Sequence, residues 1–367
     1  MKILLLTSSM LMGGTERVAA TLSNAWIERG DEVIIMPTYS GGGKCFYKLN
    51  ERVRLIYLSE ITKKFCFLSG FLRLITLRKF IISENPDVII SFLPNVNVAT
   101  ILASAFLSKL VIIGERSDPF IRPTPLFWRI ACNITYPFAS NLTVQTYAVA
   151  EKYKQSSKYI KNISIIPNPL PKEFLDSEFK PKSNSSDNII LAIGRYSQEK
   201  QFGVLIKAFS KLVNEFPDWS LHIVGEGPER ENLKNIILKL DLQNNVKLPG
   251  YTQDVLGEMQ KIDIFCLTSL YEGFPNTLLE AMGAGKPSIT FDCPSGPREM
   301  TNDGKAAILV EYNNFEEIVT GLATLMKNKE VRNKYAEQGY HFTHENYSLT
   351  SILGKWDDLF ANLNVRK

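Results

Sequence analysis

The sequence is poor in the side chains that build metal sites and disulfide frameworks. Its 367 residues include three histidines and five cysteines, and no two cysteines form a Cys-x-x-Cys pair. Scattered thiols in odd number are typical of a reducing compartment, so we expect free cysteines and a cytoplasmic protein. No Asp-x-Asp pair follows an expected strand, and a zinc site is improbable with so few ligands. We therefore expect no metal.

Long apolar runs and a strong charge of one sign are also missing. No uninterrupted apolar run reaches about 18 residues, so the sequence indicates no transmembrane helix. The apolar start, Ile3 to Leu6, is too short for a signal peptide and fits a first strand better. The net charge of +4 is far weaker than in a dedicated nucleic-acid-binding protein, so no nucleic-acid partner is expected.

Short β-branched strands alternate with amphipathic helices, and the length suits two domains. Continuous apolar strands, such as 87–90 and 110–113, suit parallel sheets covered on both faces. The alternation restarts after a polar stretch at 178–188. This predicts an α/β protein with two doubly wound domains and a ligand in the cleft between them. Strands are expected at 2–7, 32–37, 53–58, 87–92, 110–114, 141–146, 163–167, 189–193, 220–224, 246–249, 263–267 and 287–291.

A glycine pair separates the first expected strand from the first expected helix, in "TSSMLMGGTERV". Because Gly13 and Gly14 lack a Cβ, backbone N–H groups at the helix N-terminus can approach an anion, which the helix dipole favours. A simple strand-to-helix turn is an equal alternative.

Two cations stand at the entry of a later helix, in "AIGRYSQEK". Arg195 and Lys200 are unfavourable for the helix itself, so an anion such as a diphosphate is expected nearby. Solvated surface charges are the alternative. The next strand ends in "GEG" at Gly225, where a tight turn explains the glycines equally well. The following strand ends at Pro249 and Tyr251, whose backbone could pair with a nucleobase, and Thr252 could cap the next helix.

The most informative stretch is "SLYEGFPNTLLEAMGAGKPSIT", with Glu272 and Glu280 separated by seven residues. The loop between them presents backbone N–H groups at a helix start. Apolar neighbours surround Glu280, so its carboxylate needs partners such as sugar or ribose hydroxyls, with solvent exposure as the alternative. The segment "GAGKPS" imitates a phosphate-binding loop, but Pro287 breaks that motif.

Together, "GGTERV", "GRYSQEK", "VGEGPER", "PGYTQD" and "EGFPNTLLEAMGAGKP" make the whole chain resemble the GT-B-fold, retaining glycosyltransferases of family 4. The resemblance implies two Rossmann-like domains facing a central cleft. It places an acceptor-binding domain at 1–170, a linker at 171–188, a nucleotide-sugar-binding domain at 189–345 and a C-terminal helix at 346–367 that crosses back to the first domain. Trp356 would anchor that helix, with an ordinary surface helix as the alternative.

The resemblance implies transfer of a hexose or N-acetylhexosamine from a nucleotide sugar to a polyprenyl-diphosphate-linked glycan, with retention of configuration and without a metal cofactor. The expected nucleotide is UDP. Arg195 and Lys200 would neutralise the diphosphate, Glu280 would bind the ribose and Glu272 the donor sugar. The residues implied to contact the donor are Gly13, Gly14, Arg195, Lys200, Gly225, Pro249, Tyr251, Glu272, Gly273, Phe274, Pro275, Asn276, Thr277 and Glu280.

The chain departs from the family where many members place a histidine after the fifth strand. Here the segment reads "GERSDP", with Arg116 near that position. Arg116 is a catalytic candidate beside Glu272, Arg195 and Lys200, because arginine can bind a phosphate or carboxylate. A buried ion pair with Glu115 or Asp118 is an equal alternative. The histidines that remain, His222, His341 and His344, are expected to be structural.

Two other functions are compatible with such a fold: a nucleotide-sugar 2-epimerase-like isomerase, and a non-catalytic subunit that binds sugar nucleotides. Three poorly placed histidines disfavour the isomerase, and the joint presence of both cations and both acids disfavours the binding subunit.

A basic and aromatic stretch at 61–83 suits a membrane interface. We expect it to hold the protein on the inner face of the cell membrane, near a lipid-linked acceptor, although a core helix with solvated cations is the alternative. Its cations are Lys63, Lys64, Arg73, Arg78 and Lys79, and a second cluster holds Arg122, Trp128 and Arg129.

Overall fold

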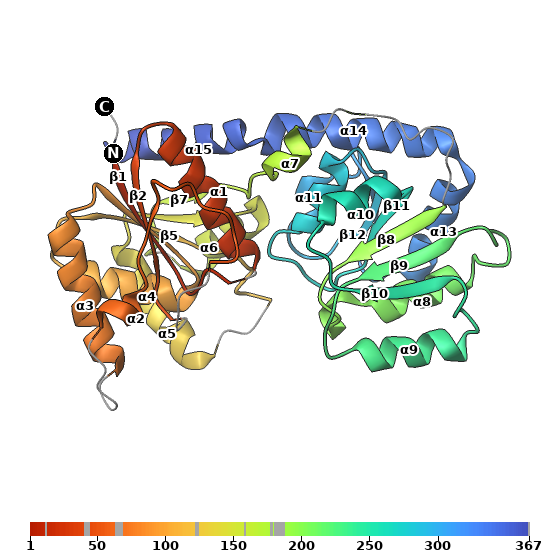
Figure 1. Ribbon diagram of the computed structural model, residues 1–367, viewed down its shortest axis with the longest axis horizontal. Coiled ribbons are helices and arrows are strands. Elements are labelled where there is room, and N and C mark those ends of the chain that lie inside the picture. Colours follow the sequence, from red (N-terminus) through yellow and green to blue (C-terminus); the bar gives the residue numbers. More distant parts are fainter. Residues whose placement is uncertain are drawn as a thin grey trace. The chain divides into compact units, whose positions relative to one another are not determined.

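The computed structural model describes residues 1–11, 13–39, 45–62, 69–121, 125–157, 159–176, 179 and 188–365. The chain folds into two compact units, shown in Figure 1. Unit 1 combines Met1–Asn168 with Ile352–Lys367, and unit 2 is Pro169–Ser351. No helix of the described residues is both long and apolar enough to span a bilayer.

Unit 1 is built on a seven-stranded parallel sheet in the order β3-β2-β1-β4-β5-β6-β7. Its strands are β1 (Lys2–Thr7), β2 (Glu32–Pro37), β3 (Arg54–Leu55), β4 (Val88–Phe92), β5 (Leu110–Gly114), β6 (Asn141–Val144) and β7 (Ile163–Ile165). Its helices are α1 (Gly14–Glu28), α2 (Leu58–Ile61), α3 (Ser69–Glu84), α4 (Pro94–Ser104), α5 (Leu126–Thr135), α6 (Tyr147–Ser156) and most of α15 (Leu349–Asn362).

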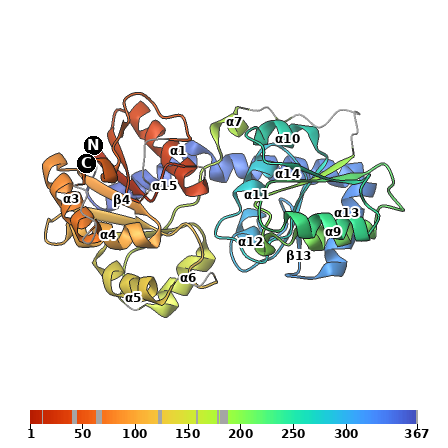
Figure 2. The same ribbon diagram turned by 60° about the horizontal axis from the view of Figure 1, so that its bottom comes forward.

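Helices cover both faces of this sheet, because successive side chains of each buried strand point to opposite faces. Leu4 and Leu6 of β1 join a core with residues of α3, α4 and α6. The other face carries α1 and α15, where Trp26 and Trp356 meet edge to face with ring centroids 5.6 Å apart. Figure 2 shows these two helices side by side. The last helix is therefore part of the core of unit 1.

Unit 2 repeats the design with six parallel strands in the order β10-β9-β8-β11-β12-β13. Its strands are β8 (Ile189–Ile193), β9 (Ser220–Val224), β10 (Val246–Gly250), β11 (Ile264–Leu267), β12 (Ser288–Phe291) and β13 (Ile308–Val310). Its helices are α7 (Lys172–Leu175), α8 (Phe202–Ser210), α9 (Arg230–Lys239), α10 (Val255–Lys261), α11 (Asn276–Gly283), α12 (Pro297–Met300), α13 (Phe315–Lys327) and α14 (Lys329–Tyr347).

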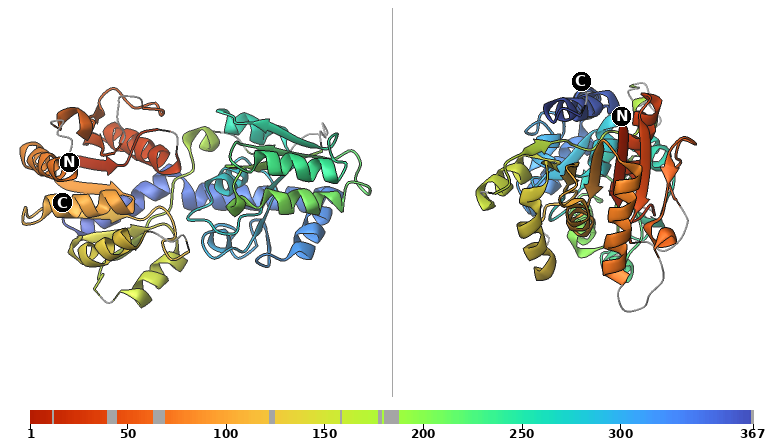
Figure 3. Two further views of the ribbon diagram at one scale, coloured as in Figure 1. Left: turned by 90° about the horizontal axis from the view of Figure 1, so that it is seen from below. Right: turned by 90° about the vertical axis from the view of Figure 1, so that its left-hand side faces the viewer.

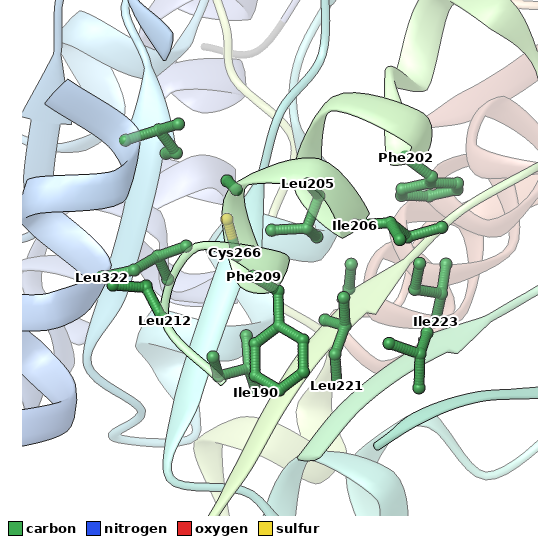
Figure 4. Close-up of a cluster of buried hydrophobic side chains, with 14 of the residues drawn as sticks. Ile190, Phe202, Leu205, Ile206, Phe209, Leu212, Leu221, Ile223, Cys266 and Leu322 are labelled. Atoms are coloured by element: carbon green, nitrogen blue, oxygen red, sulfur yellow. The ribbon is translucent and has the colours of Figure 1, made fainter. Parts of the chain in front are cut away.

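Successive side chains of β8 point to opposite faces of the sheet and pack into two separate cores. Ile190 packs beneath α8, with Phe202 and Phe209 of that helix, as Figure 4 shows. Leu191 and Ile193 face the opposite side, where α7, α10 and α11 contribute to the second core. The two views in Figure 3 show the helices on both sides of each sheet.

The predicted pair of doubly wound α/β sheets is confirmed. The strand expected at 53–58 is wrong in length, because β3 pairs only at Arg54 and Leu55 on the sheet edge and α2 begins at Leu58. Neither β13 nor three of the four helices that follow β12, namely α12, α13 and α14, were predicted from the sequence. The mostly polar sequence of α14 has a weak apolar periodicity, which explains the omission for that helix.

Candidate active site

The carboxyl ends of the parallel strands in unit 2 lie along one edge of the sheet. The chain runs from β8 to β9 and β10 on one side, then returns to β11 on the other side of β8. In doubly wound folds, ligands bind where the strand order reverses in this way. The segments that follow β8 and β11 are therefore the expected walls of a ligand site.

Lys200 and Glu272 come together at this reversal point. Lys200 Nζ donates to Glu272 Oε1 at 2.6 Å, and Ser269 Oγ donates to the same oxygen at 2.6 Å. The side chains of Lys200 and Glu272 are 17% and 11% exposed, so solvent reaches both only partly. Thr268 Oγ1 donates to the Lys200 carbonyl at 2.9 Å, which ties the two strand-end segments together. The predicted cation and the first predicted acid are thus neighbours.

Arg195 is placed differently. Arg195 is exposed, and its side chain makes no hydrogen bond or ion pair with any residue that the structure describes. An exposed guanidinium on the loop after β8 is available to an incoming anion.

The glycines after β9 permit close packing of backbone on backbone. Gly225 has φ +148°, and a Cβ there would lie 1.9 Å from the carbonyl oxygen of Gly194. Gly227 has φ +158°, and its Cβ would lie 2.4 Å from the carbonyl oxygen of Tyr196. Any side chain at these positions would push apart the segments that follow β8 and β9. Their geometry is that of the tight-turn alternative.

The end of β10 presents Pro249 as an exposed residue and Tyr251 as a side chain 50% exposed. Arg230 Nη2 donates to the carbonyl of Leu248 at 3.1 Å, which fixes this strand end from α9. The expected cap at Thr252 is wrong. Asp254 caps α10 by accepting from Gly257 N at 2.8 Å, because its carboxylate reaches the free N–H groups of the first turn.

Glu280 lies within α11 and is 1% exposed, so the solvent-exposed alternative is excluded. The loop before this helix is also packed: Phe274 and Pro275 are buried, while Gly273, Asn276 and Thr277 are half-buried. In "GAGKPS", Lys286 Nζ donates to the carbonyls of Gln260 and Ile262 at 3.3 Å, a structural role.

In unit 1, the glycine pair begins α1, with Gly13 as the residue before the helix. The Tyr47 hydroxyl accepts from Gly13 N at 2.9 Å and donates to Gly13 O at 2.7 Å. Glu16 accepts from Ser9 Oγ at 2.7 Å and its carboxylate lies beside Gly13. The Gly13 N–H that was expected to face a phosphate therefore donates to a tyrosine in this structure.

Arg116 follows β5, and its guanidinium carbon lies 3.8 Å from the centroid of the Phe92 ring. Nη1 donates to Asn168 Oδ1 at 3.1 Å. Burial lowers the pKa of Arg116 to about 9. The ion-pair alternative is wrong: Glu115 accepts a hydrogen bond from Tyr136, and Asp118 pairs with Lys152 at 2.5 Å.

Glu115 is itself a buried acid, 3% exposed. Burial raises its pKa to about 7, against the opposing effect of hydrogen bonds from Tyr136 and Tyr153. Asn97 Nδ2 donates to the Tyr136 hydroxyl at 3.1 Å and extends the polar group. The side chain of Glu115 therefore holds a proton more readily than an exposed acid.

Burial also lowers the pKa of His222 and of His344. His344 stacks on Tyr340 with ring centroids 3.8 Å apart, a packing role. Among the residues described, no three histidine, cysteine, aspartate or glutamate side chains are grouped to hold a metal ion.

Sequence reasoning missed several partners. Ser269 could have been noticed from its position three residues before Glu272, whereas Tyr47, Phe92 and Asn168 carry no motif.

In the basic stretch at 61–83, Leu77 is buried, and Arg78 donates to the carbonyls of Ala103 and Ala105, so Arg78 caps the end of α4. Lys63, Lys64 and Arg122 lie outside the described residues.

Comparison with known proteins shows which family the chain resembles. Residues 12–174 match the family model Glycosyltransferase Family 4, and residues 174–342 match Glycosyl transferases group 1. An uncharacterized glycosyltransferase of Haemophilus influenzae is 30% identical over 362 residues, which cover 94% of this chain and 95% of that protein.

A second relative, from Campylobacter jejuni, is 26% identical over 99% of both chains. Its name is GalNAc-alpha-(1->4)-GalNAc-alpha-(1->3)-diNAcBac-PP-undecaprenol alpha-1,4-N-acetyl-D-galactosaminyltransferase. The crystal structure of HepE from Anabaena, in complex with UDP, matches with a TM-score of 0.80 at 18% identity, over 99% of this chain and 100% of that chain. With two consecutive family matches and a full-length relative, the chain belongs to the GT-B-fold glycosyltransferases of family 4.

Proposed function

We propose that this glycosyltransferase moves a hexose or N-acetylhexosamine from a UDP-linked sugar to a polyprenyl-diphosphate-linked glycan, with retention of configuration and without a metal ion. The observation that carries the proposal is the Lys200–Glu272 pair at the strand reversal of unit 2. The relatives support the substrates: the name of the Campylobacter protein includes an undecaprenol-linked glycan, and HepE was solved with UDP.

The groups of unit 2 suit departure of a nucleoside diphosphate. As the bond to the sugar breaks, negative charge grows on the phosphate oxygens, and Lys200 with the exposed Arg195 stabilises it. These two cations supply the charge that a metal ion supplies elsewhere. Glu272 accepts from a sugar hydroxyl, while the buried carboxylate of Glu280 accepts from the ribose hydroxyls.

The test is incubation with a panel of UDP-sugars, with and without a short-chain polyprenyl-diphosphate-linked saccharide, in the presence of a metal chelator. Proton NMR of the product gives the anomeric configuration. Transfer with retention supports the proposal. Isomerisation of the free nucleotide sugar would identify the epimerase-like alternative, and binding without turnover on any acceptor would identify a binding subunit.

We also propose that unit 1 rests on the inner face of the cell membrane, where a lipid-linked acceptor is found. Its support comes from α5 more than from the stretch at 61–83. One face of α5 exposes large apolar side chains, and between Asp118 and Glu151 the sequence has no acidic residue. An apolar helix that also carries the exposed Arg129 and has no carboxylate suits anionic lipid. The exposed residues are Leu126 (60%), Phe127 (71%), Ile130 (49%) and Ile134 (63%).

Co-sedimentation with anionic vesicles tests this surface. Replacing these four residues by glutamine should release the protein from the vesicles at low salt. The matched control replaces Leu238 and Leu240 of unit 2, which are 55% and 37% exposed. This part of the proposal would be contradicted if wild-type protein does not bind anionic vesicles, or if the α5 variant binds them as well as wild type does.

A further inference from the structure

Arg116 follows β5, but its guanidinium lies over the neighbouring strand β4, which borders the strand reversal of unit 1. The chain leaves β1 for β2 on one side and returns to β4 on the other, so the β1–β4 boundary is the expected ligand position of this sheet. Phe92 is the last residue of β4, and the guanidinium of Arg116 stacks on its ring. The cation therefore lies over the strand that borders the reversal point.

Only one edge of this guanidinium is in use. Nη1 donates to Asn168, whereas Nε and Nη2 are shielded from water and donate to no residue that the structure describes. Nε and Nη2 form a fork of parallel donors that matches two oxygens of a carboxylate or a phosphate. The free edge thus has the shape that binds an oxyanion.

No neighbouring acid of the loop neutralises this charge. Glu115 accepts from Tyr136, and Asp118 is paired with Lys152. A cation held away from water without a counter-ion is costly, and an anionic ligand offsets that cost. Arginine remains protonated at neutral pH, so the group is a permanent charge and not a proton acceptor.

We propose that Arg116 binds an oxyanion carried by the acceptor through its Nε–Nη2 edge. This inference deepens the proposed function and rests on it, since the acceptor is assigned to unit 1. Two acceptor groups share the required chemistry: the diphosphate of a lipid carrier and the carboxylate of an acidic sugar. Because the edge is covered in this structure, binding involves a rotation of the side chain that exposes it.

The experiment measures binding of matched neutral and anionic probes by calorimetry, with UDP at saturation so that unit 2 is occupied. One pair is a short-chain polyprenyl-diphosphate-linked N-acetylglucosamine and the octyl glycoside of the same sugar. The other pair is methyl glucuronide and methyl glucoside. The variants are Arg116→Gln and Arg116→Lys. The control is Lys161→Gln, which removes an exposed cation of the same unit.

Wild type should prefer one anionic probe over its neutral partner, and Arg116→Gln should weaken that probe about 10- to 100-fold while neutral probes change less than about twofold. Arg116→Lys should keep part of the preference, because it keeps the charge without the fork. The pair that responds identifies the source of the oxyanion. Equal melting temperatures for the lysine variant and wild type would show that folding is intact.

Two results would overturn the inference: a wild type without preference for either anionic probe, and an Arg116→Gln variant with the wild-type ratio. Binding is measured apart from turnover. A wild type with the preference but without sugar transfer would therefore defeat the proposed function and leave the anion site standing.

Discussion

Lys200 and Glu272 are separated by 72 positions in the sequence, yet Nζ and Oε1 lie 2.6 Å apart. The contact joins the ends of β8 and β11, the two strands at which the order of the sheet reverses. Ser269 donates to the same carboxylate oxygen, so Glu272 is held by two donors from separate segments. Under the proposed function, the donor sugar meets this positioned carboxylate and its diphosphate meets the positioned ammonium of Lys200.

Removing either cation should slow transfer. Lys200→Ala or Arg195→Ala should lower kcat by about 10²- to 10³-fold, since each is assigned to charge that grows as the diphosphate leaves. Steady-state kinetics with the preferred UDP-sugar measures this. Lys234→Ala, which removes an exposed partner of Glu231 on α9, should leave kcat unchanged. Near-normal turnover in Arg195→Ala would remove that residue from the mechanism.

Substitutions of Glu280 and Glu272 should weaken the binding of different ligands. Glu280→Gln is expected to weaken UDP and UDP-sugar alike, because ribose is common to both. Glu272→Gln should leave UDP binding near wild type and weaken the UDP-sugar, because only the latter offers hexose hydroxyls. Calorimetric titration of both ligands into both variants decides this, and equal loss of UDP in the two variants would show that the division of roles is wrong.

The two parallel sheets and the burial of Glu280 could be predicted from the sequence for a physical reason. Continuous apolar strands read directly as a buried parallel sheet, and a carboxylate among Leu278, Leu279 and Ala281 reads as buried. What the sequence could not give are contacts made by the fold across long separations. Tyr47 reaches Gly13, and Arg116 stacks on Phe92, through positions that no local spacing encodes.

The same limit applied to the glycines after β9. The sequence left a donor contact and a tight turn open for Gly225, and it could not show that a Cβ there would meet the carbonyl oxygen of Gly194 at 1.9 Å. Periodicity shows where a glycine lies along the chain, and only the packing of two loops shows which backbone it approaches.

The final helix should be necessary for the stability of unit 1. Trp356 is fully buried and packs on Trp26, so Trp356→Ala should cost about 3–5 kcal/mol in the free energy of unfolding of unit 1. Lys355→Ala, at an exposed neighbouring position, should cost little. Urea unfolding followed by circular dichroism should show an early transition for unit 1 alone in the tryptophan variant. A single unshifted transition would contradict this role.

Glu115 should make unit 1 less stable as the pH rises. Its pKa is raised to about 7 in the folded chain, against an ordinary value of 4.5, because burial disfavours the carboxylate. The folded state therefore binds a proton more tightly than the unfolded state. The resulting stabilisation is fully present below pH 4.5 and is lost as the pH rises through about 7. The loss is limited to about 3 kcal/mol.

Glu115→Gln is a neutral mimic of the protonated acid and should remove this pH dependence. Between pH 5 and values above pH 7, the free energy of unfolding of the variant should therefore rise relative to that of wild type. The measurement is urea unfolding followed by tryptophan fluorescence in a Trp219→Phe background. The other three of the four tryptophans then all lie in unit 1. Glu151→Gln, an exposed acid paired with Lys154, is the control and should keep the wild-type slope. If the wild type and Glu115→Gln lose stability in parallel between pH 5 and pH 8, the carboxyl of Glu115 is ionised throughout, and its burial is compensated by Tyr136 and Tyr153.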